Sequence, residues 1–161
     1  MNNEIEIVQV CIVVNELKKC VKNYWELLGI GPWRLLHLNN KNMKEYKVNG
    51  EAIKEKFDMY IAVCSVGNVE LELIQPIEGA NCFWQFLQEK GEGLHHVKIK
   101  IPAEMKDDFL VHLESDGNSI MQSGYVGEDF HAITDTRDKL AMMLEIGILG
   151  RVDMEFEIYP L

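Results

Sequence analysis

The pattern of apolar and polar positions gives the same order of elements twice along the chain. In the first half, a run rich in β-branched residues predicts a strand over 5–14. A one-sided apolar stripe then predicts a helix over 16–28, with Asn15 as its N-cap and Gly29 as its stop. Strand-like runs follow this helix at 33–38, 57–66 and 69–75, and Gly67-Asn68 marks the hairpin between the last two.

The second half repeats this order of one strand, one helix and further strands. The pattern predicts a strand over 94–101 and a helix over 104–115, followed by strands near 119–123, 130–135 and 140–148. The halves also align at single residues, because Gln9 and His96 hold similar places in their strands. Leu71-Glu72-Leu73 likewise matches Leu144-Glu145-Ile146 at the end of each half. An internal repeat of this kind predicts two copies of one structural unit.

The repeat defines the predicted fold and its boundaries. We expect an α+β fold in which two βαβββ modules form a curved mixed sheet with the helices on its convex side. The predicted order is a first module over 1–76, a linking helix within 77–93, a second module over 94–148 and a C-terminal extension over 149–161.

Alternation within the strands separates four polar side chains from the helix-packed core. Strand residues alternate between faces with a period of two. The first strand of each module therefore turns Gln9 and His96 away from the helices, and the last strand does the same with Glu72 and Glu145. If the sheet curves, these four side chains line its hollow. The neighbouring His95 is predicted to face the core side, as a structural residue.

Composition and charge exclude several classes of function. The chain has 161 residues, a formal net charge of −10 and a pI of about 4.9, a balance that argues against nucleic acids and anionic membrane surfaces as partners. The four cysteines form no Cys-x-x-Cys pair, and three of them sit in apolar runs and resemble small core residues. No apolar run is long enough to span a membrane. The polar start, Met1-Asn2-Asn3-Glu4, does not resemble a signal peptide, so we expect a cytoplasmic protein.

Two segments resemble a known family. The stretch from Val69 to Ile101, VELELIQP…FWQFLQEKGEGLHHVKIKI, resembles methylmalonyl-CoA epimerases, above all in Gly91-Glu92-Gly93-Leu94-His95-His96. The opening VQVCIVVNELKKCVKNYWELLGIGPW is similar to the first module of glyoxalase-type proteins. The resemblance covers residues 5 to about 148 and points to the vicinal-oxygen-chelate superfamily, which includes both groups.

This resemblance implies a metal site and a reaction. Metal ligands in the family come from the first and last strands of each module, which places them on Gln9, Glu72, His96 and Glu145. Epimerases usually have His at the position of Gln9, whereas the order Gln, Glu, His, Glu resembles the zinc glyoxalase I of animals. One imidazole, one amide oxygen and two carboxylates suit Zn²⁺, Co²⁺, Ni²⁺, Mn²⁺ or Fe²⁺. The resemblance also implies that a carboxylate moves a proton next to a substrate carbonyl, with Glu145 as first choice and Glu72 placed symmetrically.

Three classes of function remain open from the sequence. The first is a metal-dependent isomerase or lyase of the epimerase or glyoxalase type, acting on a small 2-carbonyl substrate. The second is a metal-free ligand-binding or antibiotic-resistance protein, and the third is an extradiol-type dioxygenase, which would need a second matched His. Lys98 and Lys100 could help to hold an anion, although lysines in strands are usually solvated. Relatives with this pair of modules are commonly dimers, and open sheet edges need cover, so we expect a homodimer.

Overall fold

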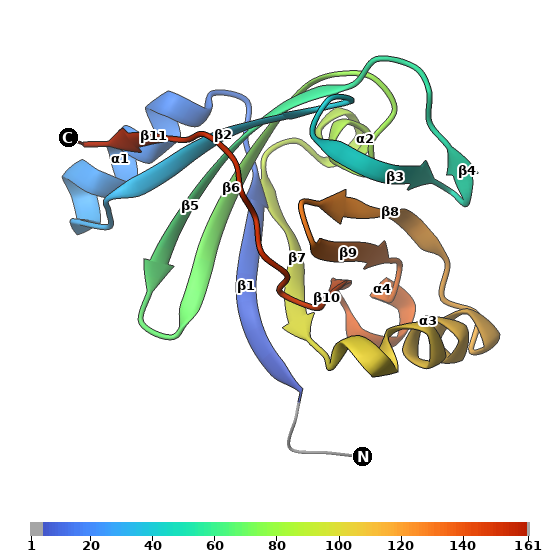
Figure 1. Cartoon of the computed structure of the whole chain (residues 1–161). Coiled ribbons are helices and arrows are strands. Elements are labelled where there is room, and N and C mark those ends of the chain that lie inside the picture. The colour runs from blue at the N-terminus through green and yellow to red at the C-terminus, as the bar shows by residue number, and fades with distance from the viewer. Residues whose placement is uncertain (1–4, 161) are drawn as a thin grey trace.

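A curved sheet carries the whole fold (Figure 1). The computed structural model describes residues 5–160, and in this range eleven strands join in the order β11-β2-β5-β6-β1-β7-β10-β9-β8-β3-β4. The elements of the first half are β1 (Glu6–Val13), α1 (Leu17–Leu28), β2 (Trp33–Asn39), β3 (Met43–Val48), β4 (Glu51–Ala52), β5 (Asp58–Val66), β6 (Val69–Glu78) and α2 (Cys82–Lys90). Those of the second half are β7 (Gly93–Lys100), a 3₁₀ turn (Ala103–Met105), α3 (Lys106–Ser115), β8 (Ile120–Val126), β9 (Asp129–Thr134), α4 (Arg137–Leu140), β10 (Met143–Gly147) and β11 (Glu157–Tyr159).

The two halves meet at the centre of the sheet in a symmetric arrangement. Strand β1 pairs antiparallel with β7, and each of these strands pairs in parallel with the last main strand of its own half, β6 or β10. The register makes Cys11 the partner of Glu72 in one half and Lys98 the partner of Glu145 in the other. The repeat seen in the sequence is therefore a pseudo-twofold repeat in the structure, and the expected α+β fold with a mixed sheet is confirmed.

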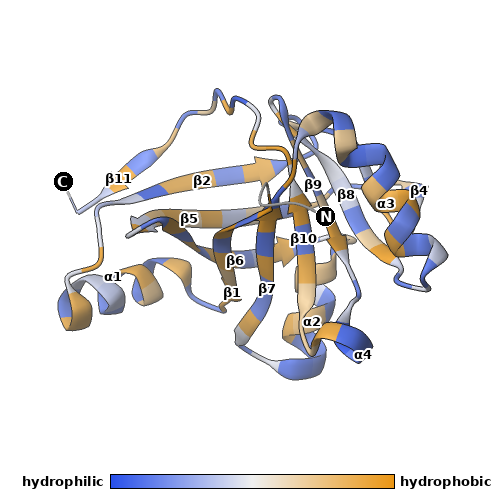
Figure 2. Ribbon diagram, turned by 90° about the horizontal axis from the view of Figure 1, so that it is seen from below, coloured by the Kyte–Doolittle hydropathy of each residue, from blue (hydrophilic) through white to orange (hydrophobic). Residues whose placement is uncertain are grey.

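Each half also contributes a strand that pairs with the other half. The β3–β4 hairpin of the first half extends the sheet beyond β8 of the second half, and β11 from the C-terminal extension pairs with β2 of the first half. Neither element was predicted. Between β10 and β11, residues 149–156 cross the sheet on the side opposite to α1 (Figure 2). We call this segment the C-terminal strap.

Helices cover both faces of the sheet. Helix α1 packs through Leu17 and Val21 on the outer face of the first half, and α3 packs on the outer face of the second half, where Ile99 and Ile146 are buried. Helix α2 contributes Phe83 to a different apolar cluster, together with inward-facing strand residues such as Cys11, Val13, Met59 and Ile74. This cluster fills one end of the inner face, which we call the hollow, and leaves the polar side chains at its centre.

Three details bear on the sequence-based expectations. Asn15 was expected to cap α1, but the residue at the N-cap position is Glu16, and the backbone N–H of Leu17 instead donates to Oε1 of Gln75 at 2.8 Å. The side chain of Asn81 does cap α2, since it accepts from the N–H of Trp84 at 2.7 Å.

Among residues 5–160, no helix has the length and apolar character needed to cross a membrane. Residues 1–4, on which the absence of a signal peptide was argued, lie outside the described range.

Candidate metal centre

A β-bulge places both histidines of the double-His segment on the hollow side of β7. Cys11 pairs with His96 and Ile12 with Leu94, so His95 is the extra residue of the bulge. Its Nδ1 lies 2.9 Å from Nδ1 of His96, and its ring packs against Phe83 at a centroid distance of 4.9 Å. The expectation that His95 faces the opposite side is therefore wrong, because strict alternation holds only in a strand without a bulge. The other expectation, that His95 is a structural residue, agrees with this packing.

The Nδ1–Nδ1 contact sets the chemistry of His96. Burial, followed by the charge of His96, lowers the pKa of His95 to about 3, so His95 is neutral at neutral pH. A neutral His95 can accept a hydrogen bond from Nδ1–H of His96. In a neutral His96 that donates in this way, the lone pair would lie on Nε2, the atom that faces the carboxylates and that a metal could bind.

Two carboxylates from opposite halves converge on His96. Nε2 of His96 lies 2.8 Å from Oε2 of Glu145 and 3.9 Å from Oε2 of Glu72. All three side chains are buried, and His96 has no exposed surface. Nε2 of His96 nevertheless has no hydrogen-bond partner among the described residues. A buried nitrogen that faces two carboxylates without a hydrogen bond is a suitable donor for a cation.

Lys98 lies inside this cluster, although strand lysines are usually solvated. Its Nζ lies 3.0 Å from Oε1 of Glu145 and 3.1 Å from Oδ2 of Asp129, and its relative exposure is only 6%. The aliphatic stem of Lys98 lies against Gly147, where a Cβ atom would collide with Cε of the lysine. The backbone of Gly147 is not in the left-handed region, so the absence of a side chain there is explained by the space that Lys98 occupies.

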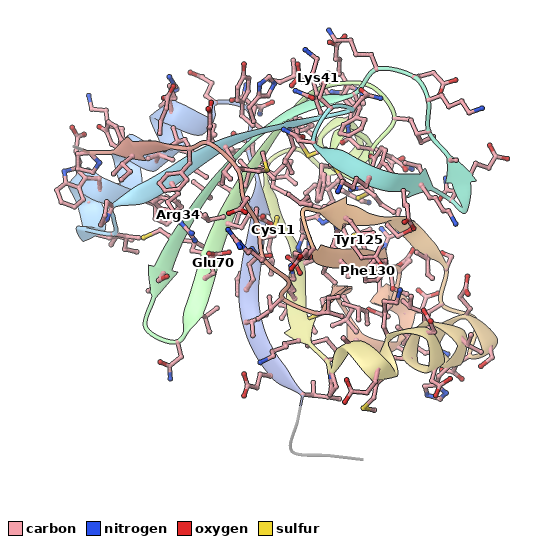
Figure 3. The ribbon with its side chains drawn as sticks, viewed as in Figure 1. Cys11, Arg34, Lys41, Glu70, Tyr125 and Phe130 are labelled. Atoms are coloured by element: carbon pink, nitrogen blue, oxygen red, sulfur yellow. The ribbon has the colours of Figure 1, made fainter. Side chains whose placement is uncertain are left out.

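Gln9 lies on the hollow side as predicted, but its amide is engaged elsewhere. Nε2 of Gln9 donates to Oε1 of Glu70 at 2.8 Å, and Arg34 binds the other oxygen of Glu70 at 3.0 Å. Figure 3 shows Arg34 and Glu70 side by side near the middle of the sheet. Of the four predicted ligands, the structure therefore brings Glu72, His96 and Glu145 together and directs the Gln9 amide nitrogen to Glu70.

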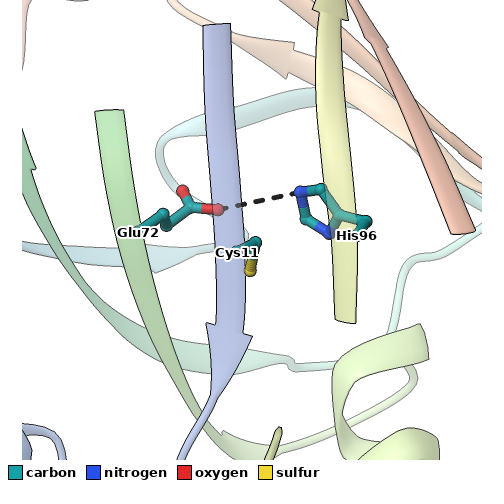
Figure 4. Close-up of side chains that lie close together, drawn as sticks. All are labelled: Cys11, Glu72 and His96. Atoms are coloured by element: carbon teal, nitrogen blue, oxygen red, sulfur yellow. Dashed lines mark ion pairs between the residues drawn. The ribbon is translucent and has the colours of Figure 1, made fainter. Parts of the chain in front are cut away.

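Cys11 is a further site residue that the sequence analysis assigned to the core. A sulfur, a carboxylate oxygen and a ring nitrogen of Cys11, Glu72 and His96 all lie within 4.8 Å of one another (Figure 4). Cys11 is fully buried and stands two residues after Gln9 on the same face of β1. The signal in the sequence was this shared face, because Gln9, Cys11 and Val13 alternate with the outward-facing residues of the strand.

The charges of the cluster fit a divalent cation. The cluster holds three carboxyl groups, those of Glu72, Glu145 and Asp129, and one ammonium, that of Lys98, which contacts Glu145 and Asp129. When all three carboxyl groups are ionised, two negative charges are uncompensated. Burial, followed by the charge of Glu145, raises the pKa of Glu72 to about 7. Burial also opposes ionisation of Glu145, but Lys98 and His96 outweigh it and lower the pKa of that carboxyl below its ordinary value. A bound divalent ion would remove the repulsion that Glu72 experiences.

A cavity of about 460 Å³ connects this cluster to the outside. Its polar part comes from Gln9, Arg34, Glu70, Glu72, Lys98 and Asp129. The rest of its lining is largely apolar and comes from β2, β5 and the C-terminal strap: Leu36, Leu38, Ile61, Val63, Leu149, Val152, Met154 and Phe156. The strap thus forms one wall of the cavity, which combines a polar floor with aliphatic sides.

Comparisons with known structures agree with this fold. A hypothetical protein from Bacillus halodurans C-125 superposes with a TM-score of 0.63 at 16% identity, over 95% of this chain and 100% of that one. A methylmalonyl-CoA epimerase in complex with methylmalonyl-CoA and NH4+ gives 0.58 at 15% identity, over 92% and 97%. The epimerase of Mycobacterium tuberculosis gives 0.55 at 14%, over 88% and 85%. At these identities the likeness concerns the fold alone.

Sequence comparisons give the family. The uncharacterized protein YqjC of Bacillus subtilis (strain 168) is 33% identical over 86 residues, which cover 53% of this chain and 50% of YqjC. The chain thus matches about half the length of this curated relative. The family model described as Glyoxalase/Bleomycin resistance protein/Dioxygenase superfamily matches residues 8–134. This match spans most of both halves of the sheet, and the chain therefore belongs to the glyoxalase/bleomycin resistance/dioxygenase superfamily, the vicinal-oxygen-chelate proteins.

Proposed function

We propose that the protein is a metal-dependent isomerase or lyase of the glyoxalase–epimerase type, which moves a proton next to a carbonyl group of a small substrate. The observation that carries the proposal is the convergence of two buried carboxylates, Glu72 and Glu145, on Nε2 of His96, with Glu72 also lining the cavity. A divalent ion held beside Glu72 and His96 would supply Lewis-acid stabilisation of negative charge on the substrate oxygens.

The contacts of the two carboxylates favour different roles for them. Glu145 is held at Oε1 by the Lys98 ammonium, and its Oε2 lies beside His96, so the ion pair with Lys98 favours its charged form. The Oε2 of Glu72 is 3.9 Å from His96, and the ammonium of Lys98 binds Glu145 rather than Glu72, so Glu72 is freer to leave the ion and accept a proton during turnover. We therefore assign proton transfer to Glu72 and the anchoring role to Glu145, which reverses the preference derived from the family resemblance.

The cavity limits the class of substrate. Its polar floor fits the neighbouring oxygens of a 2-carbonyl compound, and its aliphatic walls fit a short apolar group attached to that carbonyl. The substrate would therefore be a small 2-oxo compound, either free or at the reacting end of a thioester or thiohemiacetal.

The test combines metal analysis with proton exchange. Protein purified without chelator should contain a divalent metal, and His96→Ala should lower that content because it removes the imidazole whose Nε2 faces both carboxylates. The wild-type protein should exchange the proton next to the carbonyl of 2-oxo and acyl-CoA compounds for solvent deuterium. Glu72→Gln should abolish this exchange, since an amide cannot act as a base. Glu78→Gln, an exposed change on the same strand, is the matched control and should keep it.

One observation favours a second candidate, a metal-free binding protein. The ammonium of Lys98 already neutralises part of the carboxylate cluster without any ion. If the purified protein contains no divalent metal, does not bind one when it is added and exchanges no substrate proton, the binding protein is the better assignment.

A further inference from the structure

We propose that the metal centre lies on the β1–β6 side of the hollow, with the Cys11 thiolate, Glu72 and His96 as its protein donors. The ammonium of Lys98 holds the equivalent position beside Glu145. This inference rests on the proposed function, because it concerns the donors of the same centre. It differs from the ligand set implied by the family resemblance in two places: Cys11 replaces Gln9 on β1, and Glu145, which pairs with Lys98, is not a donor.

The positions of the three donor atoms support this centre. The sulfur of Cys11, an oxygen of Glu72 and a ring nitrogen of His96 lie within 4.8 Å of one another (Figure 4). Bonds from zinc to sulfur of about 2.3 Å and to nitrogen or oxygen of about 2.0–2.2 Å place two donors of one ion up to roughly 4 Å apart. Small rotations of side chains that are already in place would therefore close the site.

The side chains on either side point to the same location. On β1, the Gln9 amide nitrogen donates to Glu70, which Arg34 also holds, so moving this amide toward His96 would break a partly buried hydrogen bond. On the other side, the Lys98 ammonium is 3.0 Å from Glu145 and would repel a divalent ion placed there. The position with the least repulsion is therefore the side of His96 that faces Cys11 and Glu72.

The pseudo-twofold repeat shows how the centre becomes asymmetric. Cys11 pairs with Glu72 in β1–β6, and Lys98 pairs with Glu145 in β7–β10, so Cys11 and Lys98 are equivalent positions in the two halves. One equivalent residue offers a metal donor, and the other offers a fixed positive charge. Gly147, which has no side chain, leaves space for the side chain of Lys98. The equivalent residue of the first half, Ile74, fills the corresponding space there with its own buried side chain.

The donor set defines the class of metal. One thiolate, one imidazole and one carboxylate favour Zn²⁺, Co²⁺ or Fe²⁺ over Mg²⁺, Ca²⁺ and Mn²⁺, which prefer oxygen donors. Binding converts the thiol into a metal-bound thiolate and releases its proton to solvent. Three protein donors leave further coordination positions open for the two neighbouring oxygens of a substrate.

Titration of the full-length protein with Co²⁺ tests the assignment. The wild type should develop an intense near-ultraviolet absorption from sulfur-to-cobalt charge transfer, at one ion per chain. Cys11→Ser should lose this band and bind Co²⁺ at least tenfold more weakly. Cys64→Ser, which changes a buried cysteine on the outer face of the sheet, is the matched control and should keep both properties. Gln9→Ala should also keep the band and bind Co²⁺ within about threefold of the wild type.

Different results separate the donor assignment from the proposed function. If Co²⁺ binds in a His96-dependent manner without the charge-transfer band, the Cys11 assignment is overturned and the metal-dependent function stands. Loss of binding in Gln9→Ala would have the same meaning. If the wild type binds neither Co²⁺ nor Zn²⁺, both the donor assignment and the metal-dependent function are refuted. The band in the wild type needs no substitution, so the test does not depend on whether Cys11→Ser folds.

Discussion

The substitution Glu72→Gln should stabilise the metal-free protein at neutral and alkaline pH. Burial and the nearby charge of Glu145 raise the pKa of Glu72 from 4.5 to about 7. A raised carboxyl pKa means that the folded state holds this proton more tightly than the unfolded state does. The contribution to stability is present below pH 4.5 and is lost as the pH rises through 7. A difference of roughly 2.5 units at about 1.4 kcal/mol per unit corresponds to about 3 kcal/mol.

Glutamine keeps the shape of the protonated carboxyl and cannot ionise. The variant should therefore match the wild type near pH 4 and exceed it by about 3 kcal/mol at pH 8, or roughly 6–12 °C in Tm for a chain of this size. Taking the difference between the two proteins removes the effects of titratable groups that do not interact with Glu72. The assay is chemical denaturation of chelator-treated protein across pH 4–8. Equal or lower stability of the variant at pH 8 would refute the reasoning that an unpaired charge is buried at Glu72.

Three further changes test other parts of the site and the assembly. Lys98→Met should bind Zn²⁺ at least tenfold more tightly in calorimetric titrations, because it removes a buried positive charge from the hollow. Gly147→Ala should also raise the affinity for Zn²⁺, because the added Cβ displaces the Lys98 ammonium. Unchanged affinity in both variants would show that Lys98 does not oppose the metal. In His95→Phe, the new ring should fit between the phenyl rings of α2. Metal binding should nevertheless weaken by about 10- to 100-fold, since the variant lacks the hydrogen-bond partner that orients His96. An affinity equal to that of the wild type would contradict this role of His95. The protein should sediment as a homodimer at micromolar concentration, because β11 and β4 leave open edges in the sheet, and a monomer would count against this expectation.

The sequence predicted the parts of the fold that follow local pattern, and it missed the parts that depend on distant partners. Alternation placed Glu72 and Glu145 on the inner face because β6 and β10 are regular along these segments. Strands β3 and β11 were missed because each is short and polar and becomes a strand only by pairing with the opposite half. Lys98 was expected to be solvated, since nothing local reveals that Asp129 and Gly147 provide a charge partner and space for it.

Bulges explain why the two modules are more alike in structure than in side chains. In β1 the register shift leaves Val8 unpaired, and in β7 the corresponding shift leaves His95 unpaired. Both bulges turn the following residue, Gln9 or His96, into the hollow, so the backbone offers the same position twice. Only the second half uses it for an imidazole that faces the carboxylates.

Glu72 and Glu145 are equivalent in the repeat, but they differ in the residue that pairs with them on the neighbouring strand. Glu72 has a thiol as its strand neighbour, and Glu145 has an ammonium. A reaction that moves a proton at carbon needs one group that can change its protonation state and another that keeps its charge throughout. A symmetric pair of carboxylates with identical surroundings would supply two similar groups. The exchange of a thiol for an ammonium at one repeated position is enough to make them different, and Lys98→Met should therefore make Glu72 and Glu145 more alike in their pH dependence.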